Sequence, residues 1–186
     1  MPKVSESFAN AVAELARVAP RIDDAQVDAF MAAIERAPRV FLIGAGREGL
    51  STKAFAMRLT HLGKPTHWIW DDTTPGLAKG DLLIVVSGGG SIGHIDSVFD
   101  RAQEAGAEIV VVTGDPGGVT PKKAKTVLFL PAAVYKGKAD VVPSTQPMGN
   151  LFEQALFILF DQIAVTLAAR MRISKAAMEA RHRNVE

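Results

Sequence analysis

Two glycine-rich segments carry residues that could bind a phosphate group. The segment 44–49, GAGREG, follows one apolar run, and the segment Ser87-Gly88-Gly89-Gly90-Ser91 follows another. Glycines leave backbone N–H groups accessible, and these groups bind anions together with nearby hydroxyls. The second segment therefore predicts a cradle for a single phosphate monoester. A tight turn made of small residues would have the same composition and remains the alternative.

The first segment has the spacing G-x-G-x-x-G, which is typical of dinucleotide-binding turns. Such a site also needs an acidic residue about 20 positions on, and Asp71 or Asp72 would serve. However, Arg47 and Glu48 stand where small residues usually admit a pyrophosphate. A nicotinamide enzyme would also not need a second phosphate cradle nearby. We therefore expect no nucleotide cofactor here.

One glutamate, Glu153, is a candidate general base. It lies three residues after Asn150, so it has the spacing of a capping-box carboxylate if Asn150 is the N-cap of a helix. A carboxylate at a helix N-terminus is also kept ionised, which suits a base. The residues leave both roles open. His182, near the end of the chain, is either a catalytic side chain or part of a polar tail.

The surrounding pattern predicts an α/β fold, a doubly wound three-layer sandwich with a five-stranded parallel sheet. Its strands are continuous apolar runs, as expected for strands covered on both faces. In the flavodoxin-like order 2-1-3-4-5, the first and third strands are neighbours, so both glycine segments open into one crevice. We expect strands at 40–43, 66–70, 82–86, 108–113 and 126–130, an antiparallel helical pair at 4–18 and 23–36, and further helices at 48–62, 95–105, 149–170 and 174–181.

Bulk composition narrows the class of protein. The 186 residues suit one domain spanning 1–186, with no linker or repeat. The chain has no cysteine, which excludes disulfides and thiolate chemistry and suits a cytoplasmic location. Lys and Arg total 21 against 20 for Asp and Glu, so we expect no nucleic-acid partner. Polar residues interrupt the long helix at 149–170, which argues against a membrane span and favours burial against a second subunit.

Four segments resemble the 6-phospho-3-hexuloisomerase family of sugar isomerase (SIS) domains. They are GAGREG, FAMRLTHLGKP, TTPGLAKGDLLIVVSGGG and QPMGNLFEQALFILFD, and the ending Arg181-His182-Arg183-Asn184-Val185-Glu186 is similar to the family's terminus. The resemblance implies isomerisation of D-arabino-3-hexulose 6-phosphate to fructose 6-phosphate, in the ribulose monophosphate pathway of formaldehyde fixation. It also implies a homotetramer without metal or nucleotide.

That reaction gives the candidate residues roles. Glu153 is the expected base, and Arg47 neutralises developing enediolate charge or orients the phosphate. His182 moves protons between oxygens or opens a cyclic sugar, in its own site or in that of a neighbouring subunit. The family commonly has S-G-S-G-x-T in the second segment, so Gly89 and Ile92 replace two hydroxyl residues here. The expected substrate and phosphate contacts are Gly46, Arg47, Ser87, Gly89, Gly90, Ser91 and Ser144. Two rival functions remain open, a non-catalytic sugar-phosphate sensor and an isomerase of another phosphosugar.

Overall fold

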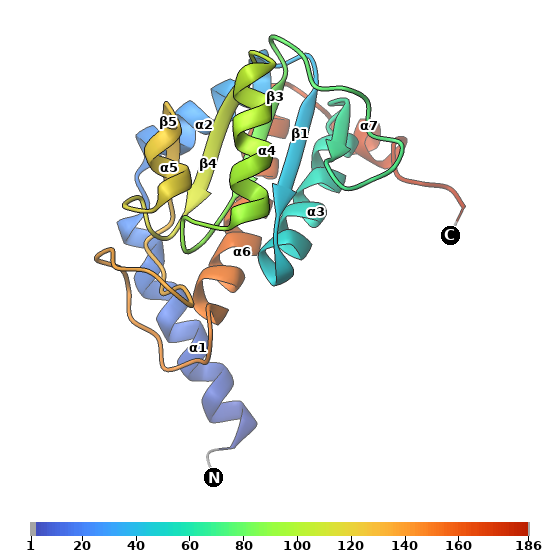
Figure 1. Ribbon diagram of the computed structural model, residues 1–186. Coiled ribbons are helices and arrows are strands. Elements are labelled where there is room, and N and C mark those ends of the chain that lie inside the picture. The colour runs from blue at the N-terminus through green and yellow to red at the C-terminus, as the bar shows by residue number, and fades with distance from the viewer. Residues whose placement is uncertain (1–2, 186) are drawn as a thin grey trace.

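The computed structural model describes residues 3–185 and has a parallel five-stranded sheet between two layers of helices (Figure 1). All strand pairs are parallel, and the strand order is β2-β1-β3-β4-β5. The predicted fold and strand order are therefore confirmed. The strands are β1 (Val40–Gly44), β2 (Thr66–Trp68), β3 (Leu82–Val86), β4 (Glu108–Thr113) and β5 (Thr126–Phe129). The helices are α1 (Val4–Val18), α2 (Asp24–Arg36), α3 (Gly46–His61), α4 (Gly93–Glu104), α5 (Val119–Lys123), α6 (Asn150–Arg170) and α7 (Lys175–Glu179), with a 3₁₀ turn at Ala19–Arg21.

Successive residues of each central strand point to opposite faces of the sheet and build two separate cores. Val40 and Leu42 join the core formed with α2, α3 and α6, whereas Phe41 and Ile43 join the core formed with α4. Every residue of β1 and β3 is buried. This burial on both faces explains why these strands are continuous apolar runs in the sequence.

The long helix α6 belongs to the larger core. Its Phe160 stacks on Phe55 of α3, with ring centroids 4.3 Å apart, and Phe30 of α2 lies against both rings. By length and composition alone α6 could cross a membrane, with a mean hydropathy of 1.5, but half of that window is buried inside the protein. Packing against α3 and the sheet accounts for the buried half, and an apolar strip elsewhere on α6 stays exposed.

The two N-terminal helices differ from the expected antiparallel pair. The chain stays helical through Ala19 into the 3₁₀ turn and breaks only at Ile22, so α1 does not fold back along α2. Instead α1 packs on α6 and projects from the sandwich, while α2 covers β4 and β5 (Figure 1). The expectation was wrong because Pro20 at the start of a 3₁₀ turn continues a helical path instead of reversing it.

Most element boundaries fall within two residues of their predicted positions. The helix α5 was not predicted, since its five residues contain Pro121 and show no helical periodicity. The helix α3 begins at Gly46, two residues before the predicted start, and β2 ends at Trp68 instead of Trp70. The earlier start of α3 matters for function because it places Arg47 and Glu48 in the first turn of that helix.

Candidate active site

The first glycine segment packs the start of α3 tightly against the end of β1. A Cβ atom at Gly49 would lie 2.7 Å from the carbonyl oxygen of Gly44, so only glycine allows this approach. Gly46 has a φ of +54°, which glycine adopts without strain, and it is exposed. Two of these three glycines therefore serve helix packing, and Gly46 opens the helix N-terminus to the crevice.

Glu153 is paired with Arg47 and does not form a capping box. The N-cap of α6 is Gly149 instead of Asn150, and no side chain caps this helix. The carboxylate of Glu153 instead accepts a hydrogen bond from Nε of Arg47, which reaches across from α3. The capping alternative is therefore wrong, and the carboxylate is turned toward the neighbouring helix.

Arg47 and Glu153 line a hollow of about 310 Å³ between the first turns of α3 and α6. The Glu153 side chain is 14% exposed and the Arg47 side chain 64%. The other lining residues are Leu50, Ser51, Gln154 and Phe157. A mostly buried carboxylate beside a solvent-accessible guanidinium can take a proton from a bound molecule while the cation stabilises nearby negative charge.

A second carboxyl group, Glu48, stands next to this ion pair and was not predicted as a site residue. Its Oε2 accepts a hydrogen bond from the Gly88 N–H at 2.9 Å, which joins the two glycine segments. Burial raises the pKa of Glu48, the Gly88 N–H lowers it, and the charge of Glu153 raises it further, so that the net shift is upward. The sequence offered only one signal for Glu48, which is that it and Arg47 are charged residues in a segment otherwise made of Gly and Ala.

The second glycine segment forms a turn directly after β3. Gly90 has a φ of +71°, and its N–H donates to the carbonyl of Ser87, so this donor is used by the turn itself. Ser87 is completely buried. Among the buried side-chain nitrogen and oxygen atoms of residues 3–185, its Oγ alone has no hydrogen-bond partner. Gly89 is partly exposed and Ser91 is exposed. The phosphate contacts predicted for Ser87, Gly89, Gly90 and Ser91 stay predictions. The Gly90 N–H can bind a phosphate only by sharing its hydrogen with the Ser87 carbonyl.

Ser144 lies in a different cluster. Its hydroxyl donates to Glu14 of α1, which also accepts from the backbone and side chain of Thr145 at 2.8 Å and from Nε2 of Gln146 at 3.0 Å. Burial of Glu14 would raise its pKa, but the hydrogen bonds from Gln146, Ser144 and Thr145 outweigh burial and lower it to about 2. This cluster fixes the segment that leads into α6, so Ser144 contributes to its position.

His182 lies at the far end of α3 from Arg47. Its ring centroid is 5.3 Å from that of His61, and the neighbouring Arg181 donates to the His61 carbonyl. The 16 residues of α3 span about 24 Å at 1.5 Å per residue. Within one chain, the structure therefore does not bring His182 together with Glu153.

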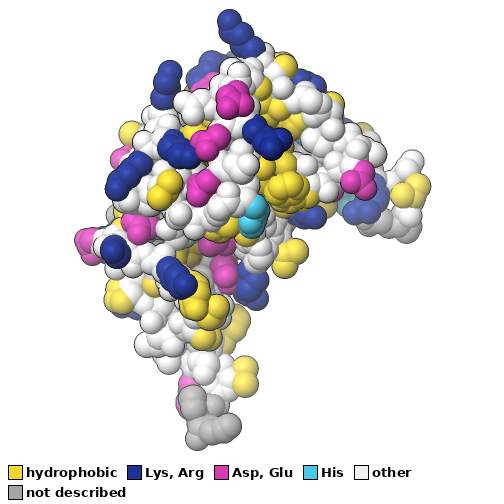
Figure 2. Space-filling model, viewed as in Figure 1, with side chains coloured by type: hydrophobic (Ala, Val, Ile, Leu, Met, Phe, Trp, Pro, Cys, Tyr) yellow, Lys and Arg dark blue, Asp and Glu magenta, His cyan; other side chains and the backbone are white. Residues whose placement is uncertain are grey.

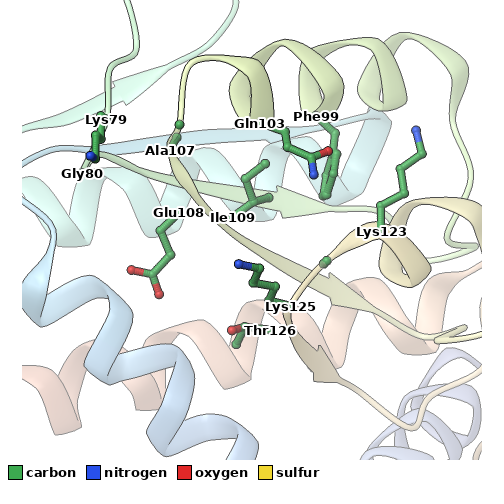
Figure 3. A pocket seen from close by; sticks show the side chains of 12 residues that line it. Lys79, Gly80, Phe99, Gln103, Ala107, Glu108, Ile109, Lys123, Lys125 and Thr126 are labelled. Carbon is green, nitrogen blue, oxygen red and sulfur yellow. The ribbon is translucent and has the colours of Figure 1, made fainter.

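A larger hollow, of about 620 Å³, lies at the opposite edge of the sheet (Figure 3). It is lined by residues at the amino ends of β4 and β5, among them Glu108, Lys125 and Thr126, and it contains none of the predicted site residues. Ligands of doubly wound sheets bind at the carboxyl ends of the strands, so we assign the site to the smaller hollow and the crevice beside it.

Other kinds of site, for a metal ion or a nucleic acid, would need particular groupings of charged residues. On the face shown in Figure 2, Lys and Arg side chains are interspersed with Asp and Glu. Within the described part of the chain, no group of three or more His, Cys, Asp or Glu side chains is arranged to hold a metal ion. The expected absence of metal and nucleic acid stays a prediction.

Comparison with known proteins identifies the family that has this fold. Residues 33–146 match the SIS domain family, and the chain belongs to that family. Its known members include sugar isomerases, which confirms the class predicted from the glycine segments and the QPMGNLFEQ motif.

Within this family, the chain is similar to proteins named 3-hexulose-6-phosphate isomerase. The Mycobacterium gastri protein of that name is 35% identical over 93% of this chain and 86% of its own length. The Bacillus subtilis protein is 31% identical over 99% of this chain and 100% of its own. A crystal structure of a Methanococcus jannaschii protein, from which that molecular function was inferred, has a TM-score of 0.84 at 25% identity and covers 97% of this chain and 99% of its own. The predicted resemblance is therefore confirmed.

Proposed function

We propose that the protein is a sugar-phosphate isomerase that converts D-arabino-3-hexulose 6-phosphate to D-fructose 6-phosphate. One observation carries this proposal. The Glu153 carboxylate, paired with Arg47, lies where the first turns of α3 and α6 meet, beside the turn that follows β3. The relatives named for this reaction, which match nearly the whole chain, support the choice of substrate. The proposal includes a cytoplasmic role in the ribulose monophosphate pathway.

The reaction moves a carbonyl from C3 to C2 through a cis-enediol. Glu153 takes the proton from C2 and returns it to C3, because a carboxylate positioned beside the substrate by an ion pair with Arg47 is a suitable base. Arg47, largely exposed, stabilises the negative charge that develops on the enediolate oxygens. As the substrate enters, the guanidinium divides its contacts between Glu153 and the sugar.

The phosphate of the substrate binds at the turn after β3. Ser87 and Ser91 supply hydroxyls, Gly89 supplies a backbone N–H group, Gly90 shares its N–H between the Ser87 carbonyl and the phosphate, and Gly46 leaves room for the sugar chain. The buried, unpartnered Oγ of Ser87 supports a ligand at this turn. Ser144 contributes a hydroxyl only if the substrate displaces its bond to Glu14.

The test is an assay of the purified protein with D-arabino-3-hexulose 6-phosphate, without added metal or nucleotide. We expect conversion to fructose 6-phosphate, and we expect Glu153→Gln to lose nearly all turnover while keeping its fold. Glu104→Gln is the matched control, since Glu104 is exposed at the end of α4. Binding of fructose 6-phosphate without conversion would favour a sensor, and conversion of a different phosphosugar in a parallel panel would change the substrate.

The active form is proposed to be a homo-oligomer, with a tetramer as the expected size. Large apolar side chains remain exposed on α1, α3 and α6 of the single chain. These are Val4, Phe8 and Val12 on α1, and Leu50, Phe157 and Val165 on α3 and α6. The first three are spaced four residues apart and so share one face of α1, which projects from the sandwich. A second copy would cover these faces.

In such an oligomer His182 acts in the site of a neighbouring subunit, because α3 separates it from Glu153 of its own chain. Mixed oligomers test this assignment. Inactive Glu153→Gln protein and inactive His182→Ala protein are unfolded and refolded together, and we expect activity to return in the mixture. No recovery from mixed oligomers, verified by mass, would show that both residues act within one chain or that His182 has no role.

A further inference from the structure

The carboxyl group of Glu48 lies at the contact between the two glycine segments, within electrostatic reach of Glu153. Its Oε2 is fixed by the Gly88 N–H at 2.9 Å. Its Oε1 occupies space that only a glycine at 88 leaves open, since a Cβ there would lie 2.3 Å from it. Among the described residues, Oε1 has no hydrogen-bond partner. One oxygen is therefore held by the Gly88 N–H, and the other has no hydrogen-bond partner beside the turn that follows β3.

We propose that Glu48 is a second catalytic residue, the neutral acid that protonates a sugar oxygen while Glu153 removes a proton from carbon. The inference rests on the proposed isomerisation. The fixed Oε2 accepts from Gly88 as a carbonyl oxygen does, and Oε1 carries the proton as a hydroxyl.

The electrostatic surroundings favour this protonated form. Among the described residues, Glu153 of α6 is the charged group that acts on the pKa of Glu48, and Arg47 precedes Glu48 on the same helix. Arg47 is directed to Glu153 and forms an ion pair with it. Burial and the negative charge of Glu153 then raise the pKa of Glu48. Two neighbouring carboxyls in different environments thus divide into one base and one acid, as acid-base pairs in enzymes do.

The proton transfers balance without any further reactant. Glu153 takes the C2 proton, the C2–H electron pair forms the C2–C3 double bond, and the C3 carbonyl oxygen takes the proton from Glu48. The cis-enediol then loses its O2 proton to the Glu48 carboxylate, while Glu153 returns its proton to C3. Both side chains end in their starting states, and the carbonyl has moved from C3 to C2.

The variant Glu48→Gln tests the proposal because the amide oxygen can still accept from Gly88 but the side chain holds no acidic proton. We expect kcat to fall by about 10² to 10⁴, with the affinity for fructose 6-phosphate, measured by thermal shift, within about threefold of wild type. We also expect the high-pH limb of the kcat profile to disappear. Glu104→Gln, assayed in parallel, is expected to keep both limbs.

Full turnover with an unchanged pH profile in Glu48→Gln would overturn the proposal. Inactivity of the wild-type protein toward every phosphosugar would instead refute the proposed function. If the variant does not fold, the wild-type protein is titrated by NMR with ¹³C-labelled glutamate side chains. We expect one carboxyl to titrate above the ordinary value of 4.5, and titration of every glutamate at or below that value would overturn the proposal.

Discussion

Replacing Glu14 by glutamine is expected to destabilise the protein by about 3 kcal/mol at pH 7. Glu14 is 4% exposed and accepts four hydrogen bonds from the segment that leads into α6. These bonds lower its pKa from 4.5 to about 2. At about 1.4 kcal/mol per pKa unit, this shift corresponds to about 3 kcal/mol of folding stability. Glutamine resembles the protonated side chain and so loses that contribution.

The sign of the pH dependence follows from the lowered pKa. The folded state binds the Glu14 proton more weakly than the unfolded chain, so the stabilisation is complete above pH 4.5 and is lost as the pH falls toward 2. Urea unfolding followed by far-ultraviolet circular dichroism measures both variants at pH 7 and pH 3. We expect the difference between wild type and Glu14→Gln to fall to less than half at pH 3.

The control for Glu14 is Glu104→Gln, which removes an exposed carboxylate and is expected to change stability by less than about 0.5 kcal/mol. Equal stability of wild type and Glu14→Gln at pH 7 would refute the reasoning. So would a difference of the same size at both pH values, because the loss would then not come from the charge of Glu14.

Three further predictions concern the crevice. Gly88→Ala places a Cβ 2.3 Å from Oε1 of Glu48 and should cost about 1 to 3 kcal/mol of stability and most of the turnover. The control is Gly76→Ala, where an added Cβ has no neighbour within 4 Å, and it should change neither quantity in the same melting and activity assays. Arg47→Met should lower kcat about 100-fold, since it removes the cation beside Glu153, and an unchanged kcat would exclude that role. Because the pKa of Glu48 is raised, the folded state binds its proton more tightly than the unfolded chain does. Wild type should therefore lose stability as the pH rises above 4.5, and Glu48→Gln should lose less. Melting temperatures of the two proteins measured from pH 4 to 9 would contradict this prediction if their difference stayed constant.

The sequence predicted those features that depend on local patterns. Buried strands such as β1 and β3 are continuous apolar runs, and the alternation with helices predicted their order, so the two glycine segments were correctly placed at the ends of neighbouring strands. The QPMGNLFEQ motif singled out Glu153, whose catalytic role stays a prediction. These features were predictable because strand burial and helix periodicity depend on the types of residues that are close together in the sequence.

Contacts between distant segments were not predictable in this way. Nothing near Glu153 in the sequence indicates that Arg47, 106 positions away, is its partner. Likewise Ser144 was expected at the phosphate, but the packing of α1 on α6 brings Glu14 to it. Glu48 was treated as an obstacle to a dinucleotide, and only the approach of Gly88 reveals its carboxyl as part of the site.

The central claim is that Glu153 moves a proton between C2 and C3 of a phosphorylated hexulose. The most direct measurement is turnover of D-arabino-3-hexulose 6-phosphate in D₂O, followed by NMR of the fructose 6-phosphate formed. A carboxylate that exchanges its proton with solvent predicts deuterium at C3 of the product with the wild-type protein and no product with folded Glu153→Gln. Product formation at the wild-type rate by Glu153→Gln, or no product from a wild-type protein that binds fructose 6-phosphate, would contradict the account.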